Sequence, residues 1–138
     1  MHGDDLSQIS TVVDAYNLAS MKTVIPISGF DKDRLNLPFH VRFAENNDAF
    51  VGIGMSKPVS LMGNMLVLAD QKQVLCVYPY RDSDRTKITE NTRNVLIIGY
   101  GATRISEQQL TEAVETTLGY IKLVSGGEIV MIKVFSVA

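Results

Sequence analysis

Short apolar segments of strand length fill the middle of the chain, and this pattern limits the possible folds more than any other feature. Phe39, Val41 and Phe43 alternate with polar residues, as in a strand with one buried face. Residues 65–69 and 73–78 flank Asp70-Gln71-Lys72, which predicts a hairpin. Further apolar runs predict strands at residues 49–54, 95–100 and 129–137. No run reaches the roughly 20 residues that a membrane-spanning helix needs.

A helical pattern precedes these strands. Four apolar residues have the spacing i, i+3, i+4, i+7 of one helix face: Ile9, Val12, Val13 and Tyr16. The pattern ends near Ser20, and Pro26 and Gly29 then predict a loop.

A second helix is predicted to begin at Ser106. Ser106 and Gln109 have the spacing of a capping box, in which each side chain binds a free amide of the first turn. Behind them one face is apolar: Leu110, Ala113, Val114, Thr117, Leu118 and Ile121. Ser125-Gly126-Gly127 ends this helix. We therefore expect a single β-rich α+β domain over residues 1–138, with one helix at each end.

Composition and charge exclude several classes of protein. The chain is 46% apolar and has a formal net charge of −2, so any nucleic acid would have to be held by a local basic patch. One cysteine cannot form an internal disulfide, and the acidic start of the chain, residues 1–5, does not resemble a signal peptide. These features predict a soluble, cytoplasmic protein that does not enter a membrane.

Few side chains could support nucleophilic or metal chemistry. The chain has two histidines, His2 near the terminus and His40 on the polar face of a predicted strand. Cys76 lies mid-strand, where a buried and inert thiol is expected. No Cys/His pair has the spacing of metal ligands, so we expect no metal and no cofactor. Catalysis, if present, would depend on positioning and polarisation.

A dense group of charges lies between the apolar runs 74–78 and 95–99. The segment from Tyr80 to Thr89 carries five charged residues: Arg81, Asp82, Asp84, Arg85 and Lys87. Charge of this density at the end of a strand pair is typical of a binding or reactive loop. The alternative is a solvated turn whose charges pair with one another.

Several segments resemble the editing domain of the phenylalanyl-tRNA synthetase beta subunit. Residues 13–18 contain its Val-Asp-x-x-Asn helix, residues 25–35 correspond to its Gln-Pro-x-His-x-Phe-Asp loop, and residues 65–70 resemble its Val-Ile-Ala-Asp strand. Residues 81–86 match the Arg-Asp-Ser-x-x-Thr motif of the free-standing, or solo, members of this B-three/B-four domain family. The resemblance covers residues 9 to 137.

The resemblance implies a fold, an activity and a pocket. The fold would be a β-sandwich-like core of mixed strands with flanking helices, and the synthetase domain hydrolyses tyrosine wrongly attached to tRNA. Its catalytic positions fall on Asn17, on Ser28 in place of a histidine, and on Asp84 in place of a tyrosine-sensing glutamate. These three residues are expected to converge. Longer solo members carry an N-terminal helical segment that this chain lacks, so a wall of the pocket is expected either to be missing or to be supplied by a partner protein or a second copy.

Two interpretations of Asp84 stay open. Its carboxylate could accept a hydrogen bond from a substrate hydroxyl and so reject substrates that lack one. It could instead form an ion pair with Arg85 or Arg81 in a surface turn.

The cations in and beside the loop form a cluster suited to phosphate. Four of them are expected to bind the acceptor end of tRNA: Arg81, Arg85, Lys87 and Arg93. Asp82 and Thr86 are expected to hold the shape of the loop.

Three functions from different classes follow. The chain binds the aminoacylated end of tRNA, with or without hydrolysis of mischarged aminoacyl-tRNA in trans, and is not expected to aminoacylate by itself. Alternatively it is a small-molecule-binding domain that kept the pocket, or a protein-interaction module that kept the fold. The acidic net charge favours the two alternatives, and the basic loop favours tRNA.

Overall fold

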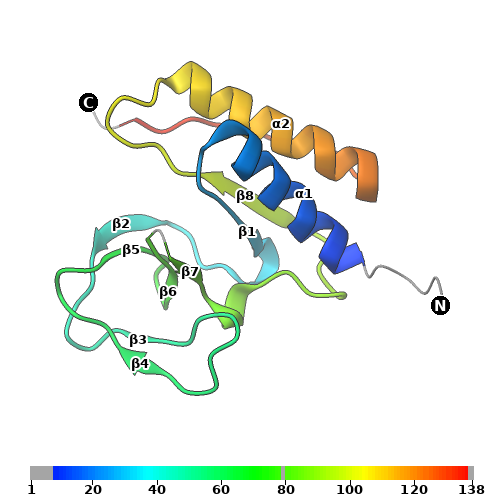
Figure 1. Cartoon of the computed structure of the whole chain (residues 1–138). Helices are drawn as coiled ribbons and strands as arrows, with labels where there is room; N and C mark the ends of the chain where they lie inside the picture. Colours follow the sequence, from blue (N-terminus) through cyan, green and yellow to red (C-terminus); the bar gives the residue numbers. More distant parts are fainter. Residues whose placement is uncertain (1–7, 79, 137–138) are drawn as a thin grey trace. The chain divides into compact units, whose positions relative to one another are not determined.

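The chain folds with mixed α and β structure, in a computed structural model that describes residues 8–78 and 80–136 (Figure 1). These residues form two α-helices, two 3-10 helices and eight strands, which confirms the predicted α+β class. The described residues divide into two compact units, the first with residues 8–29, 88–91 and 96–136, the second with residues 30–78, 80–87 and 92–95. The single-domain organisation stays a prediction.

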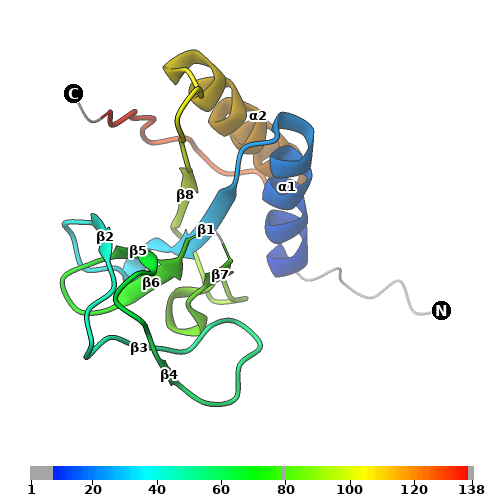
Figure 2. The ribbon, with the colours of Figure 1, turned by 60° about the vertical axis from the view of Figure 1, so that its left-hand side comes forward.

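The two helices of the first unit pack against each other and run side by side in Figures 1 and 2. In α1 (Gln8–Thr23) the buried face comprises Val12, Ala15, Tyr16 and Ala19. Lys22 Nζ donates to the Tyr120 hydroxyl of α2 at 3.0 Å and lies 5.6 Å from the centre of its ring. The predicted N-terminal helix is confirmed, and it ends at Thr23 instead of Ser20. The side chain of Ile9 lies outside the described residues.

The second helix, α2 (Glu107–Ser125), begins with the predicted capping box. Ser106 Oγ accepts from the Gln109 amide at 3.1 Å, and Gln109 Oε1 accepts from the Ser106 amide at 2.9 Å. Ala113 and Thr117 on the apolar face are completely buried. Both reciprocal bonds satisfy amides that a helix cannot satisfy internally, so the local sequence alone determines this helix start.

Replacing Ser106 with alanine is expected to lower the free energy of unfolding by about 1 kcal/mol, because the Gln109 amide loses its acceptor. Urea unfolding measures the change. Ser106→Asp keeps an acceptor and serves as the control. Equal stabilities of the two variants would contradict the role of the cap.

Strand β1 (Ile27–Asp31) pairs with β8 (Val95–Gly99) in a two-stranded sheet. The loop predicted around Pro26 and Gly29 is therefore wrong, since the strand begins directly after Pro26. Gly29 lies inside it because the ring of Tyr16 occupies the space of a side chain: a Cβ atom there would be 2.6 Å from Tyr16 Cε1. A glycine is needed here because the strand packs closely against Tyr16, and not because the chain turns.

The second unit contains a four-stranded antiparallel sheet in the order β2-β5-β6-β7. Its strands are β2 (His40–Phe43), β5 (Leu66–Ala69), β6 (Val74–Val77) and β7 (Arg81–Asp82). Strands β5 and β6 form the predicted hairpin, and Cys76 is buried, as predicted. A buried cluster supports this unit: Ala44, Phe50, Leu61, Val67, Val74 and Val77.

The strand predicted over residues 49–54 is shorter than expected. Strand β3 (Ala49–Phe50) pairs with β4 (Val59–Ser60), and Gly52 makes only an isolated bridge to Ser83. Gly54 has a φ of +83°, a left-handed conformation that ends the extended chain.

Two carboxylates stabilise the second unit and have lowered pKa values. Asp48 binds Arg42 on β2 through two hydrogen bonds of 2.6 and 3.1 Å, and this contact holds the pKa of Asp48 below its usual value and raises that of Arg42. Burial raises the pKa of Asp70, but hydrogen bonds from three backbone amides and the Asn36 side chain outweigh it and lower the pKa. Both side chains therefore act as structural anions.

The strand predicted over residues 129–137 is wrong for residues 129–136, and residue 137 lies outside the described residues. Residues 126–136 contain neither helix nor strand. Gly126 and Gly127, with φ of 70° and 96°, turn the chain after α2. The apolar sequence has high strand propensity, but a strand exists only with a ladder partner, and no described residue provides one here.

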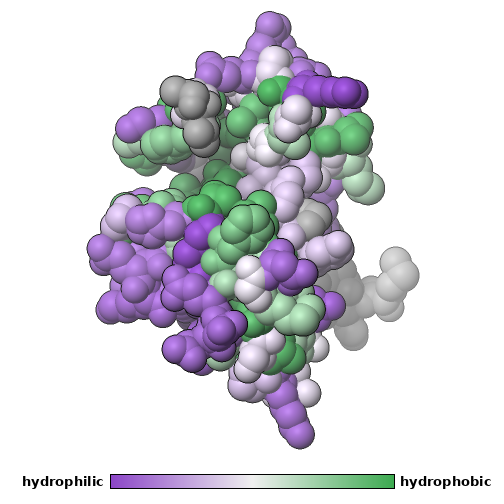
Figure 3. Space-filling model, turned by 90° about the vertical axis from the view of Figure 1, so that its left-hand side faces the viewer, coloured by the Kyte–Doolittle hydropathy of each residue, from purple (hydrophilic) through white to green (hydrophobic). Residues whose placement is uncertain are grey.

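Both units expose large apolar side chains, and Figure 3 shows green apolar areas between purple polar ones on one face. Val130 is 90% exposed in the first unit, and Val41 and Phe43 are 67% and 64% exposed in the second. Exposed apolar area is typical of surfaces that bind a partner. The predicted second copy or partner protein stays a prediction. Among the described residues, no helix has the length and hydropathy to cross a membrane.

Candidate functional site

Residues 80–87 of the charged loop are a fixed part of the second unit. Its first residues form β7, and Asp84–Thr86 form a 3-10 helix, η2. Ser83 caps η2, because its hydroxyl accepts from the Arg85 amide at 3.2 Å. The amide of Ser83 donates to Leu75 O at 2.8 Å and that of Asp84 to Val51 O at 2.9 Å. Backbone hydrogen bonds on both sides of the loop therefore hold its shape.

Of the two residues predicted to structure the loop, Thr86 is completely buried and Asp82 is half-buried in β7. The carbonyl of Asp82 accepts from the Ile53 amide at 2.9 Å. Thr86 Oγ1 has no hydrogen-bond partner among the described residues. Thr86 is thus held by packing, and its hydroxyl makes no bond among the described residues; the structural role of Asp82 and Thr86 stays a prediction.

Replacing Thr86 with valine is expected to leave the free energy of unfolding unchanged or to raise it, because valine has a similar shape and removes a buried hydroxyl that has no partner among the described residues. Thr86→Ala is the control and should cost stability through the cavity it leaves. Denaturant unfolding of both variants measures this. A loss of about 1–3 kcal/mol in Thr86→Val would mean that a water molecule or ligand pairs with the hydroxyl.

Asp84 forms an ion pair, but its partner is Lys87 and not Arg85 or Arg81. Lys87 Nζ lies 2.7 Å from Asp84 Oδ1, and the two side chains are 40% and 39% exposed. Asp84 Oδ2 has no hydrogen-bond partner among the residues that the structure describes. An exposed pair of this kind contributes little to stability, and Asp84 keeps one oxygen that can accept another donor.

The other two predicted catalytic residues belong to the first unit. Asn17 is exposed on α1, and Ser28 is 5% exposed within β1. Asp84 belongs to the second unit. The convergence of Asn17, Ser28 and Asp84 stays a prediction.

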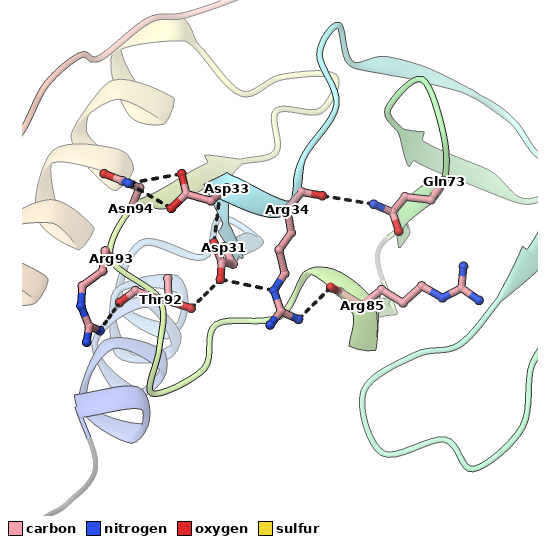
Figure 4. Close-up of polar contacts among 8 residues, drawn as sticks. All are labelled: Asp31, Asp33, Arg34, Gln73, Arg85, Thr92, Arg93 and Asn94. Atoms are coloured by element: carbon pink, nitrogen blue, oxygen red, sulfur yellow. Dashed lines mark hydrogen bonds and ion pairs between the residues drawn. The ribbon is translucent and has the colours of Figure 1, made fainter.

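A polar cluster around Asp31 was not predicted from the sequence (Figure 4). The Asp31 carboxylate is 8% exposed and accepts from Thr92 Oγ1 at 2.9 Å and from the Asp33 amide at 3.1 Å. Arg34, the last residue of the 3-10 helix η1 (Lys32–Arg34), places Nε 3.5 Å from Asp31 Oδ2. The only local sequence signal is the i, i+3 spacing of Asp31 and Arg34; Thr92 lies 61 residues away.

Three arginines extend from this cluster. In Figure 4, Arg34 lies between Arg93 and Arg85, and the three guanidinium groups do not converge on one point. Arg93 Nη1 donates to Thr92 O at 3.1 Å, whereas the guanidinium of Arg85 has no hydrogen bond or ion pair with any described residue. We call Arg34, Arg85 and Arg93 the arginine row. Groups spaced in this way suit a ligand with several separated anionic groups better than one small anion.

The carboxylates beside the arginine row are already bonded. Asp31 accepts the three donors given above, and both oxygens of Asp33 accept from Asn94 Nδ2, at 3.2 and 3.0 Å. Three cations thus face two carboxylates among the residues of Figure 4, which gives a local excess of positive charge on an acidic protein. Of the other predicted cations, Arg81 Nη1 donates to Ile53 O at 3.4 Å, and Lys87 is paired with Asp84.

Comparisons with known proteins agree on one family. The sequence model of the B3/4 domain family matches residues 1–118 of this chain. The phenylalanine–tRNA ligase beta subunit of Haemophilus ducreyi is 28% identical over 89 residues, which are 64% of this chain and 11% of that protein. The beta subunit of Pectobacterium atrosepticum is 32% identical over 92 residues, 67% of this chain and 11% of that protein. The chain thus spans about a tenth of these relatives.

A solved structure has the same fold. The crystal structure of an N-terminal fragment of the phenylalanyl-tRNA synthetase beta subunit from Pyrococcus horikoshii matches with a TM-score of 0.71 and 18% sequence identity. The match covers 85% of this chain and 40% of that fragment. At this identity the likeness establishes the fold alone.

Proposed function

The chain belongs to the B3/4 domain family, and from this premise we propose that it binds the aminoacylated end of tRNA. The resemblance to phenylalanine–tRNA ligase beta subunits that the sequence predicts is confirmed by the family match over residues 1–118. Function is a property of a site and not of a fold, so the proposal depends on the chemistry of the charged loop and the arginine row.

The observation that carries the proposal is the arginine row, in which the Arg85 guanidinium has no partner among the described residues. Guanidinium groups bind phosphate oxygens through a planar pair of donors, and phosphate contacts position a nucleic acid without reading its sequence. An unpaired guanidinium can bind phosphate without first breaking an ion pair. The overall charge of −2 gives no general attraction for RNA, so this local excess of positive charge is the feature that favours tRNA.

Hydrolysis in trans is the second part of the proposal. An aminoacyl ester is already activated, so its hydrolysis needs a placed water and a polarised carbonyl, and no catalytic triad. Asn17 can both donate and accept hydrogen bonds, which suits an amino acid's polar groups. Asp84 Oδ2 has no hydrogen-bond partner among the described residues and could accept a bond from a substrate hydroxyl. With Ser28, these are the proposed catalytic residues.

Replacing Arg85 with alanine is expected to weaken tRNA binding and to lower the slope of log affinity against log salt by about one unit, because one phosphate contact is lost. Filter binding at several salt concentrations measures the slope. Arg104→Ala, which removes an exposed arginine outside the arginine row, is the matched control and should keep the wild-type slope.

The companion variant Asp84→Asn separates the choice of aminoacyl group from the affinity for tRNA. It is expected to leave the affinity for uncharged tRNA unchanged and to alter which aminoacyl group is preferred or cleaved. If neither Arg85→Ala nor Asp84→Asn changes anything, the loop is a solvated turn and a protein-interaction function becomes the better interpretation.

A further inference from the structure

Arg34 connects two segments of the second unit that are distant in the sequence. Its Nε lies 3.5 Å from Asp31 Oδ2, and its Nη1 donates to the carbonyl oxygen of Arg85 at 3.3 Å, across 51 residues (Figure 4). One guanidinium therefore joins a carboxylate beside η1 to the backbone of η2.

The Asp31 end of this connection is firmly held. The carboxylate is buried, and the hydroxyl of Thr92 and the amide of Asp33 bind it from other directions. The main chain of Arg34 is held as well, because its carbonyl accepts from Gln73 Nε2 at 3.3 Å. Since both the backbone and the guanidinium of Arg34 have bonded partners, Arg34 can constrain the segment to which it donates.

The Arg85 end of this connection carries a guanidinium that makes no hydrogen bond or ion pair within the described chain. The amide of Arg85 donates to Ser83 Oγ and its carbonyl accepts from Arg34, so both backbone polar groups of this residue are occupied. Only its side chain extends without a partner among the described residues. We propose that Arg34 is a positioning residue, which fixes the backbone of η2 so that the Arg85 guanidinium is presented to phosphate.

The role requires an arginine. Its planar fork directs Nε and Nη1 at two acceptors in fixed geometry, whereas the single ammonium of a lysine would keep the charge and bind at most one of them well. Arg34→Lys therefore separates the two roles that Arg34 could have. If Arg34 bound phosphate directly through its charge, a lysine would keep that contact. If Arg34 positions η2, a lysine would lose the effect.

The first experiment needs no ligand. Hydrogen–deuterium exchange of the whole chain should be faster by about five- to tenfold for residues 83–87 in Arg34→Lys, because one hydrogen bond to η2 is lost. Arg104→Lys is the matched control and should exchange as the wild type does. Unchanged exchange at residues 83–87 in Arg34→Lys would overturn the proposal.

The second experiment rests on the proposed function and uses uncharged tRNA. In a double-mutant cycle, Arg34→Lys is expected to weaken binding about fivefold with Arg85 present and by less than about twofold in the Arg85→Ala background. The same loss in both backgrounds would show that Arg34 does not act through Arg85. If the wild type binds no tRNA, the proposed function fails, and the exchange experiment alone decides the role of Arg34.

Discussion

Asp70→Ala is expected to lower the free energy of unfolding at neutral pH by about 3 kcal/mol, since it removes a buried anion that several donors share. Asp70 is 6% exposed; its Oδ1 accepts from the amides of Lys72 and Gln73 at 2.8 and 3.0 Å. Its Oδ2 accepts from the Asn36 amide at 2.8 Å and from Asn36 Nδ2 at 3.4 Å. The variant leaves these donors without their acceptor and loosens the β5–β6 hairpin from residue 36.

The effect of this substitution should depend on pH. The folded state lowers the pKa of Asp70, so the folded chain binds this proton more weakly than the unfolded chain does. The stabilisation is therefore complete above the unfolded pKa of about 3.9 and disappears as the pH falls through the lower folded value. Urea unfolding between neutral and acidic pH should show the gap between wild type and Asp70→Ala closing below about pH 4.

Asp14→Ala provides the control for Asp70. Asp14 is exposed on α1, and its removal should change stability by less than about 0.5 kcal/mol at any pH. A gap between wild type and Asp70→Ala that stays constant, or widens, as the pH falls would contradict the assigned role of the carboxylate.

Gly29→Ala is expected to cost about 2–3 kcal/mol, because the first unit has no room for a methyl group at this position. The new Cβ would lie 2.6 Å from Tyr16 Cε1 and 3.0 Å from Ile88 Cδ1. Tyr16 and Ile88 are both 7% exposed, so neither can move aside without disturbing the core.

Gly119→Ala is the matched control, and its effect on the free energy of unfolding should have the opposite sign. Gly119 lies within α2, and no atom is within 4 Å of the position that its Cβ would take. The variant should gain about 0.5–1 kcal/mol, because alanine loses less backbone entropy in a helix. Thermal unfolding of both variants tests the pair. A stable Gly29→Ala would contradict the packing of Tyr16 against β1.

Local sequence signals predicted the elements that depend on neighbouring residues. Ser106 and Gln109 are three residues apart, and the two sides of the β5–β6 hairpin are separated by one short turn, so short-range chemistry determines both. The pattern around Gly29 predicts a loop, whereas the structure has a strand, because the ring that packs on Gly29 comes from Tyr16, on another element. The apolar run after α2 predicts a strand that does not form, because propensity does not reveal whether a ladder partner exists.

The candidate site likewise combines features that neighbouring residues determine with contacts between segments that are distant in the sequence. The density of charge identified residues 81–87 as a loop of interest, but the contacts that organise it come from distant segments. Arg34 reaches Arg85 O across 51 residues, and Thr92 reaches Asp31 across 61. No periodicity or spacing in the sequence marks these pairs. The roles of Asn17, Ser28 and Asp84 rest on the family resemblance, and their convergence stays a prediction.

The most direct test of the central claim is a filter-binding titration of the wild-type chain with aminoacylated and uncharged tRNA over a series of salt concentrations. We expect aminoacylated tRNA to bind, with log affinity falling linearly as log salt rises, because phosphate contacts release counterions. Uncharged tRNA should show the same salt slope with lower affinity, since it lacks the aminoacyl group. No binding of either tRNA, or binding that does not change with salt, would contradict the claim.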